Sequence, residues 1–366
     1  MTEWFSKRLD EIVEFNPRET IKKGVIAKKI AMDKLQPFCR DITEFELEPF
    51  SGGTKFRNGD TIMARITPCL ENGKTARVNI LEDGEVGFGS TEYIVFRAKE
   101  GVDADFVYYL ISSPFVREPA IKSMVGSSGR QRVQMDVLQN LTLMIPSFEE
   151  QNKIARILKV IDDKIALNRQ INDNLEQQAR AIYCDMFISN ANPSWQIGHL
   201  SDIITVRYGK DHKKLADGVY PVYGSGGIMR YVEKPLYDKE TVLIPRKGTL
   251  NNVMYVNEPF WSVDTMFFTE MKLPNVAKFV LHFIKSKDLA SLNAGSAVPS
   301  MTTDILNAME LSIPDADTFA KFESIVAPMY QTMHQTTQES SKLAELRDSL
   351  LPRLMSGELD VSDLDL

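Results

Sequence analysis

Residues 133–182 read VQMDVLQNLTLMIPSFEEQNKIARILKVIDDKIALNRQINDNLEQQARAI, and residues 301–350 read MTTDILNAMELSIPDADTFAKFESIVAPMYQTMHQTTQESSKLAELRDSL. The two stretches align without a gap, so that residue 133 falls on 301 at an offset of 168 residues. In this alignment Asp136 falls on Asp304 and Pro146 on Pro314. Internal repetition on this scale predicts that the chain consists of two related halves.

Each copy continues into a long amphipathic helix of about 35 to 40 residues, or roughly 55 Å. Apolar residues recur at spacings of three and four, as at Leu158, Ile161 and Ile165, which is the period of a coiled-coil seam. One such stripe cannot be buried alone, so we expect the two helices to pair. The alternative is an ordinary helical hairpin within a core. Polar residues interrupt both seams, at Asn168, Asn172, Thr336 and Ser340.

A second repeat opens each half. Trp4-x4-Leu9-x-Glu11-Ile12 returns as Trp195-x4-Leu200-x-Asp202-Ile203, and we interpret both as the entry strand or first turn of a small domain. Strand-like runs follow in the same order, at 56–65 and 237–246 and then at 88–96 and 260–268, before short helices at 106–113 and 279–286. Residues 220–228 have no evident counterpart in the first half, and residues 68–75 have none in the second.

We therefore predict an α+β fold with two tandem α+β domains, each followed by a long helix. The expected segments are a first domain at 1–147, a helix at 148–190, a second domain at 191–314, a helix at 315–355 and an acidic tail at 356–366.

Charge is unevenly distributed. The net charge is −7, and residues 315–366 account for −6 of it, with 4 Lys+Arg against 10 Asp+Glu. The domains at 1–147 and 191–314 are close to neutral, so each can carry a basic face for a nucleic acid. Three widely separated cysteines favour a reducing cytoplasm and argue against a structural metal or a disulfide frame. No apolar run is long enough for a membrane span.

Catalytic motifs are weak in this sequence. Gly73-Lys74-Thr75 resembles the end of a P-loop, but Pro68 stands where that motif needs glycine. An enzyme with an unfamiliar site stays open as an alternative, as does a coiled-coil scaffold with no role on DNA.

What the domains do offer is recognition chemistry. Lys and Arg neutralise phosphates, whereas Arg, Asn and Gln read base edges in the major groove. The best candidate is the donor-rich glycine loop at 126–132. The candidates of the first half are Lys22, Lys23, Lys55, Arg57, Arg65, Lys74, Ser127, Ser128, Arg130, Gln131 and Arg132. Those of the second half are Lys210, Lys213, Lys214, Tyr223, Ser225, Arg230, Arg246, Lys247, Asn251 and Asn252.

Over nearly its whole length, the chain resembles the specificity subunits of type I restriction–modification systems. The resemblance rests on both Trp-x4-Leu starts, on the internal repeat and on the segments 59–65, 145–154, 220–227 and 346–359. The second helix departs from the family pattern, because Thr318-Phe319 replaces a Glu-Gln pair and Pro328 interrupts the seam. Proline at this position predicts a kink.

The resemblance implies how the chain works. Each domain would be a target-recognition domain for one half of a bipartite double-stranded DNA sequence, and the helices would pair as an antiparallel coiled coil. Two modification subunits would methylate adenine with S-adenosylmethionine, and two restriction subunits would cut unmethylated DNA using ATP and Mg²⁺. A system that only methylates is the alternative. The cofactors would belong to those partners, and the chain itself would bind no cofactor or metal and catalyse nothing.

Overall fold

The beginning and the end of each domain pair with one another. In the computed structural model, β1 (Phe5–Arg8) is antiparallel to β10 (Thr142–Ile145), and β11 (Gln196–His199) is antiparallel to β19 (Glu310–Ile313). The structure describes residues 4–127, 129–292, 300–362 and 364. Its contacts divide the chain into unit 1, Met1–Gln170 with Thr336–Leu366, and unit 2, Ile171–Gln335.

The repeated Trp-x4-Leu patterns form the entry strand and a helical turn, as expected. The turns are α1 (Leu9–Ile12) and α6 (Leu200–Ile203), and the leucine and isoleucine of each are buried. The repeated acid caps the turn. The Glu11 carboxylate accepts the Arg8 backbone N–H at 2.6 Å, and that of Asp202 accepts the His199 N–H at 2.7 Å.

Each unit then contains one antiparallel four-stranded sheet with the same order. In unit 1 it comprises β2 (Val13–Phe15), β9 (Tyr93–Ala98), β6 (Thr61–Ala64) and β7 (Thr75–Arg77). In unit 2 it comprises β12 (Ile204–Tyr208), β18 (Met266–Met271), β15 (Thr241–Pro245) and β16 (Met254–Val256). The two central strands of each sheet, β9 and β6 in unit 1 and β18 and β15 in unit 2, overlap the strand-like runs that the sequence predicts, whereas the outer strands lie outside those runs.

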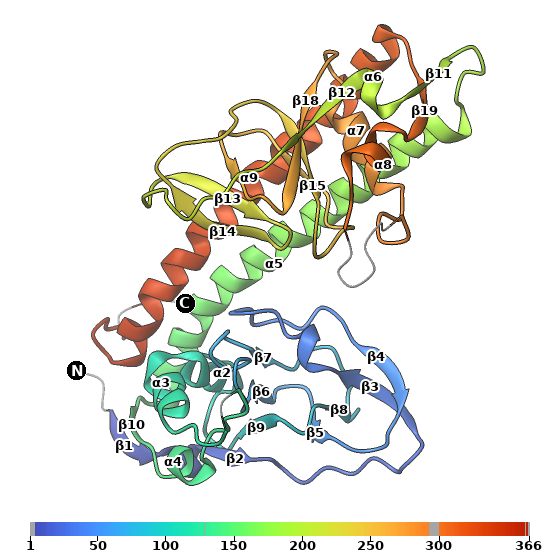
Figure 1. Cartoon of the computed structure of the whole chain (residues 1–366). Helices are drawn as coiled ribbons and strands as arrows, with labels where there is room; N and C mark the ends of the chain where they lie inside the picture. Colours follow the sequence, from blue (N-terminus) through green and yellow to red (C-terminus); the bar gives the residue numbers. More distant parts are fainter. Residues whose placement is uncertain (1–3, 128, 293–299, 363, 365–366) are drawn as a thin grey trace. The chain divides into compact units, whose positions relative to one another are not determined.

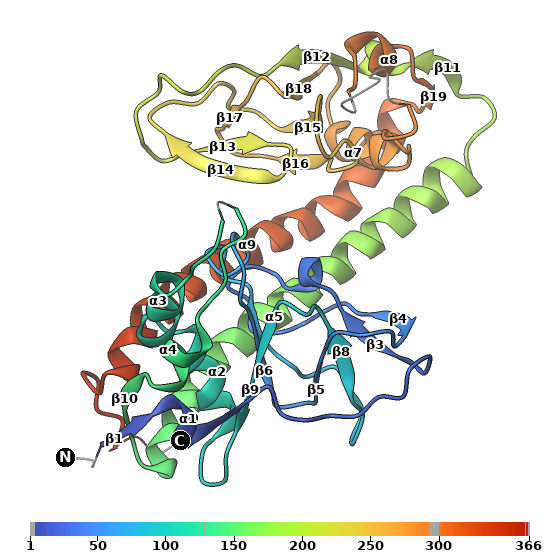
Figure 2. The same ribbon diagram turned by 60° about the horizontal axis from the view of Figure 1, so that its bottom comes forward.

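A second sheet, of four strands in unit 1 and three strands in unit 2, completes each domain (Figure 2). In unit 1 its order is β4 (Glu46–Pro49), β3 (Ile26–Ile30), β8 (Gly87–Gly89) and β5 (Thr54–Phe56). In unit 2 its order is β14 (Gly227–Val232), β13 (Tyr220–Gly224) and β17 (Trp261–Ser262).

The expectation that residues 220–228 lack a counterpart is wrong at the level of topology. Strand β13 runs parallel to β17 and antiparallel to β14, as β3 runs parallel to β8 and antiparallel to β4. Likewise, residues 68–74 lie in the β6–β7 connection and Thr75 begins β7, and this connection matches the β15–β16 connection of unit 2. Backbone pairing keeps the strand order even where the side-chain sequences share no pattern.

Each unit also contains short helices. In unit 1 these are the 3₁₀ turn η1 (Met32–Lys34), α2 (Ala104–Ser112), α3 (Pro114–Lys122) and α4 (Met135–Gln139), and in unit 2 they are α7 (Ala277–Lys285) and α8 (Thr303–Asn307). Asp103 caps α2 by accepting the Phe106 N–H at 2.7 Å. The buried face of α2 joins one apolar core with residues of both long helices, among them Leu158 and Leu354.

Both long helices contribute to both units. Helix α5 (Phe148–Cys184) starts in unit 1 and ends in unit 2, where a π-helical turn, η2 (Asp185–Ser189), follows it. Helix α9 (Ala316–Met355) starts in unit 2 and ends in unit 1. The two segments lie side by side within each unit (Figure 1). The kink at Pro328 stays a prediction, and α9 continues through this residue.

The pairing of the helices is antiparallel. In unit 1, Asn168 is fully buried and donates to Glu339 at 2.7 Å and to Ser340 at 3.2 Å, while the earlier residue Asp162 meets the later Arg347. The polar layer expected in the seam is therefore present at Asn168 and Ser340. In unit 2, Tyr183 and Phe322 pack ring against ring.

The segment after α9 belongs to the core of unit 1. Val361 is buried, Lys153 donates to the Ser362 carbonyl at 2.7 Å, and the Trp4 ring packs over Gly357. The domain boundaries expected from the sequence stay a prediction, because the contacts group the helices with both domains. None of the helices in the described ranges is both long enough and apolar enough to cross a membrane.

Candidate nucleic-acid interface

Three loops of unit 1 meet at one end of the antiparallel sheet formed by β2, β9, β6 and β7. The Arg65 N–H, just after β6, donates to the carbonyl of Glu92, just before β9, at 2.9 Å. The Val133 N–H donates to the Arg65 carbonyl at 2.9 Å. These bonds bring the candidate loop at 126–132 beside Arg65. We call this meeting point junction 1.

A carboxylate lies between two arginines at junction 1. The Arg132 guanidinium binds the Glu92 carboxylate through two nitrogens, the shorter contact being 2.6 Å, and the Arg65 Nε lies 3.7 Å from it. The hydrogen bond from Arg132, together with the charges of Arg132 and Arg65, lowers the pKa of Glu92 against the opposing effect of burial. Side-chain exposures of 44% for Arg132, 32% for Arg65 and 24% for Glu92 leave the cluster open to solvent.

Unit 2 contains the same junction with a different charge. The Arg246 N–H donates to the Thr265 carbonyl at 2.8 Å, and the Met301 N–H donates to the Arg246 carbonyl at 2.9 Å. Arg246 and Thr265 therefore occupy the positions of Arg65 and Glu92, and we call this point junction 2. The Arg246 guanidinium lies 5.3 Å from the centre of the exposed Tyr208 ring and donates to the Asp264 backbone carbonyl at 3.2 Å.

The loop at 126–132 is held by its own backbone at its base. Val125 and Arg132 exchange N–H to carbonyl bonds at 3.1 and 2.9 Å, and Gln131 bonds to Thr67 through its backbone. Ser127 and Arg130 are exposed, whereas Gln131 is half-buried. Ser128 lies outside the described residues. The loop is therefore anchored at junction 1 and presents its polar tip to solvent.

Other first-half candidates lie apart from junction 1 or already have partners. Arg57 pairs with Glu19 at 2.7 Å near the start of β6, at the opposite end from Arg65. Lys74 lies at the junction end but donates to the Met32 carbonyl at 2.7 Å. Lys55, on β5, lies over the Phe50 ring. Lys22 and Lys23 are exposed in the segment before β3. The sequence alone does not distinguish the candidates at junction 1 from those that lie elsewhere or already have partners.

Several second-half candidates hold loops in place. The Tyr223 hydroxyl bonds to Glu258 at 3.2 Å, and burial raises its pKa. Arg230 pairs with Asp217 at 2.8 Å, Asn251 bonds to Asp288 at 3.1 Å, and Asn252 donates to the Ser225 carbonyl at 2.7 Å. Exposed side chains in this half are Lys210, Lys213, Lys214 and Lys247. The Lys210 N–H donates to the Ser262 carbonyl at 2.8 Å, which places Lys210 near junction 2.

A family model described as "Type I restriction modification DNA specificity domain" matches residues 1–177 and 192–343. The chain belongs to this family. It is a type I specificity subunit, as the resemblance in the sequence indicates, and specificity subunits are not catalytic, since the enzymatic activities belong to partner subunits.

Similar proteins support this assignment. The subunit is 23% identical over 310 residues to the MjaIX specificity subunit of Methanocaldococcus jannaschii, covering 73% of this chain and 71% of that one. It is 21% identical over 411 residues to the HindI specificity subunit of Haemophilus influenzae, covering 83% and 87%. Its fold is similar to a type I specificity subunit structure from M. genitalium, with a TM-score of 0.60 and 18% identity over 97% of this chain and 96% of that one.

Glu92 is a site residue that the sequence analysis missed. Aligning 88–96 with 260–268 residue by residue places Glu92 on Asp264 and so predicts an acid in both halves. The backbone bonds place Glu92 on Thr265 instead, one residue further on. The acid at the first junction therefore has no equivalent at the second. Three residues separate Thr61 from Arg65, whereas four separate Thr241 from Arg246, and this extra residue was the signal in the sequence that the two halves are not in a simple residue-by-residue register.

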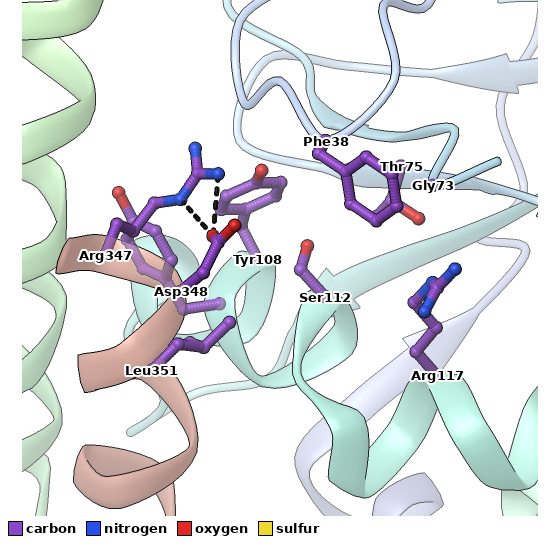
Figure 3. A pocket seen from close by; sticks show the side chains of 10 residues that line it. Phe38, Gly73, Thr75, Tyr108, Ser112, Arg117, Arg347, Asp348 and Leu351 are labelled. Atoms are coloured by element: carbon purple, nitrogen blue, oxygen red, sulfur yellow. Dashed lines mark hydrogen bonds and ion pairs between the residues drawn. The ribbon is translucent and has the colours of Figure 1, made fainter. Parts of the chain in front are cut away.

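A cavity of about 50 Å³ lies within unit 1 (Figure 3). Tyr108 and Ser112 of α2, Arg117 of α3, and Asp348 and Leu351 of α9 line it. It has room for a few water molecules. Across the described ranges, no three His, Cys, Asp or Glu side chains are grouped so as to hold a metal ion.

Proposed function

We propose that this specificity subunit reads a bipartite DNA target with a non-specific gap. The domain of unit 1 would read one half-site and the domain of unit 2 the other. The observation that carries the proposal is the repeated junction, in which the same two backbone hydrogen bonds hold Arg65 in one domain and Arg246 in the other. The frame around these arginines is shared, while the surrounding loop sequences differ. Two sites of this kind suit a DNA target in which the phosphate backbone is the same at both half-sites and the base sequences differ.

The side chains near each junction suit complementary tasks. Exposed lysines such as Lys210 and Lys247 can neutralise phosphates and fix the domain on the duplex. The loop at 126–132 presents Arg130 on an anchored base, and a guanidinium can bind a guanine edge through two hydrogen bonds. We assign recognition to these loops and positioning to the lysines.

The subunit would direct the chemistry of its partners. We propose that two modification subunits methylate adenines in the target with S-adenosylmethionine, and that two restriction subunits cut unmethylated DNA with ATP and Mg²⁺. These cofactors would bind the partners, so the subunit itself would bind none. Free thiols at Cys39, Cys69 and Cys184 are compatible with work in the cytoplasm.

The proposal is tested by sequencing methylated adenines in a methylation-free host that expresses the subunit with its modification subunit. We expect two short defined sequences separated by a fixed number of unspecified bases. A single contiguous motif would contradict the division of labour between the domains. Failure of the complex to bind mixed-sequence DNA at low salt would instead favour a scaffold without a role on DNA.

A further inference from the structure

The two junctions share a backbone frame but differ in one charge. At junction 1, the Glu92 carboxylate is 2.6 Å from the Arg132 guanidinium and 3.7 Å from the Arg65 Nε. In the described part of the chain, this Arg65 nitrogen makes no hydrogen bond. This nitrogen is buried, although 32% of the Arg65 side chain and 44% of the Arg132 side chain are exposed. One carboxylate thus partly neutralises two partly exposed arginines.

At junction 2, a hydroxyl side chain stands in place of that carboxylate. Thr265 takes the position of Glu92, and within the described ranges Arg246 forms no ion pair. Asp264 is adjacent, but its backbone carbonyl rather than its carboxylate accepts from Arg246.

The difference changes what each junction can offer to an anion. A DNA phosphate that approaches Arg132 must displace a carboxylate bound through two hydrogen bonds, which are among the stronger ones in proteins. A phosphate that approaches Arg246 displaces no carboxylate. The cation there already lies over an aromatic face, which orients it without cancelling its charge.

We propose that Glu92 is a built-in competitor for phosphate, so that the two half-sites are held with unequal electrostatic strength. Arg246 makes a phosphate contact at junction 2, whereas Arg65 and Arg132 make theirs only when Glu92 is displaced. The inference rests on the proposed function and adds the residue that sets the balance between the two recognition domains.

The first test is the salt dependence of DNA binding by the full-length subunit, measured on a short duplex of mixed sequence. Each phosphate neutralised adds about 0.9 to the slope of log K against log salt. Glu92→Gln keeps the side-chain shape and should bind more tightly at low salt, with a slope steeper by about one to two. Glu100→Gln is the matched control, because the exposed Glu100 follows β9 at the opposite end and the charge change is the same.

The second test reverses the difference in unit 2. Thr265→Glu should introduce the competitor at junction 2 and make the slope shallower by about one, while Thr265→Gln should leave it unchanged. Glu92→Thr, which copies junction 2, should reproduce the effect of Glu92→Gln. This variant and the Thr265 pair keep the test decisive if Glu92→Gln does not fold, and thermal unfolding identifies any variant that is not folded.

The outcomes separate this inference from the function on which it rests. If the wild-type subunit binds DNA and Glu92→Gln behaves like Glu100→Gln, and Thr265→Glu like Thr265→Gln, then Glu92 is no competitor and the inference is overturned. The proposed function would stand in that case. If the wild-type subunit fails to bind mixed-sequence DNA at low salt, both are overturned.

Discussion

The Arg347 guanidinium on α9 donates to the Asp162 carboxylate on α5 at 2.8 Å, and both side chains are nearly buried, with exposures of 11% and 5%. The other carboxylate oxygen accepts the Tyr109 hydroxyl of α2, also at 2.8 Å. This ion pair therefore connects both long helices and the recognition domain of unit 1. Burial of two opposite charges avoids a large loss of stability only if each charge keeps its partners.

Loss of the Arg347 charge should destabilise unit 1 strongly. In Arg347→Met, the Asp162 carboxylate stays buried. Of the two hydrogen-bond donors named above, it keeps the Tyr109 hydroxyl and loses the guanidinium. We expect the free energy of unfolding to fall by about 3 to 5 kcal/mol. Chemical denaturation measures this, with Lys342→Met as the control, since Lys342 is an exposed cation on the same helix. Adding Asp162→Leu should recover much of the loss, and a loss no larger than that of the control would mean that the pair contributes little.

Removing the two arginines of the loop at 126–132 should weaken DNA binding without unfolding the protein. Arg130 is exposed and Arg132 is partly so, which leaves no apolar core to disturb. For Arg130→Ala with Arg132→Ala we expect a loss of about 1 to 3 kcal/mol from the base contact of Arg130. Arg132 should add less, because it already pairs with Glu92. The measurement is DNA affinity in the complex with modification subunits at matched salt. The control is Lys7→Ala with Lys122→Ala, which removes the same charge elsewhere, and an equal effect of both pairs would exclude the loop from the site.

Exchange of one domain should change one half of the target. Replacing residues 196–300 with the same segment of a relative exchanges β11 and keeps β19, and the two strands can still pair because their contacts are backbone hydrogen bonds. We expect a new sequence at one half-site and the original sequence at the other, because each domain has its own junction and loops. Methylome sequencing measures both at once. A change in both half-sites would show that the domains do not read independently.

The length of α5 should set the gap between the half-sites. Four residues inserted after Asn174 add roughly 6 Å of helix and nearly keep the face of the apolar seam. Since DNA rises about 3.4 Å per base pair, we expect the gap to grow by one or two base pairs with both half-sites unchanged. Methylome sequencing of the insertion variant gives the gap directly. If the gap keeps its length, the helices do not act as the ruler.

Acid should destabilise unit 2 through His282. This side chain is buried, stacks on Tyr183 and bonds to the Tyr330 hydroxyl at 2.9 Å. Burial, together with the nearby positive charge of Lys285, lowers the pKa of His282 from 6.5 to about 4. The folded state then binds fewer protons than the unfolded state between these values, so stability falls as the pH drops from about 6.5 to about 4.

The contribution of His282 to this loss should be about 2 to 3 kcal/mol. His282→Phe removes the titrating group and should flatten the fall in unfolding free energy over the same window by that amount. His199→Asn, which changes an exposed histidine, is the control for loss of a histidine elsewhere in unit 2. Equal pH profiles for His282→Phe and the wild type would show that His282 does not titrate in this way.

The sequence predicted the frame of this protein well. Leu9, Ile12, Leu200 and Ile203 are buried where the repeated pattern places them, and Asn168 and Ser340, which the sequence places in the two seams, contact one another. Such features follow from local periodicity and from the repeat, which a linear chain displays directly. The basic candidates for DNA contact were harder to rank from the sequence, because their charge does not show where they lie in the fold. Arg57 and Arg65 are eight residues apart, and only the strand between them sends them to opposite ends of a sheet.

The sequence by itself therefore determined the family, the tandem α+β domains and the two long helices, because periodicity and repetition are encoded locally. Only the tertiary structure decided that β13 corresponds to β3 and that Glu92 corresponds to Thr265 rather than Asp264. The physical reason is that strand register and loop contact are set by backbone hydrogen bonds between distant segments. These bonds are independent of side-chain identity, so they persist where the sequence has diverged, and a one-residue shift in them moves a charge from one site to another.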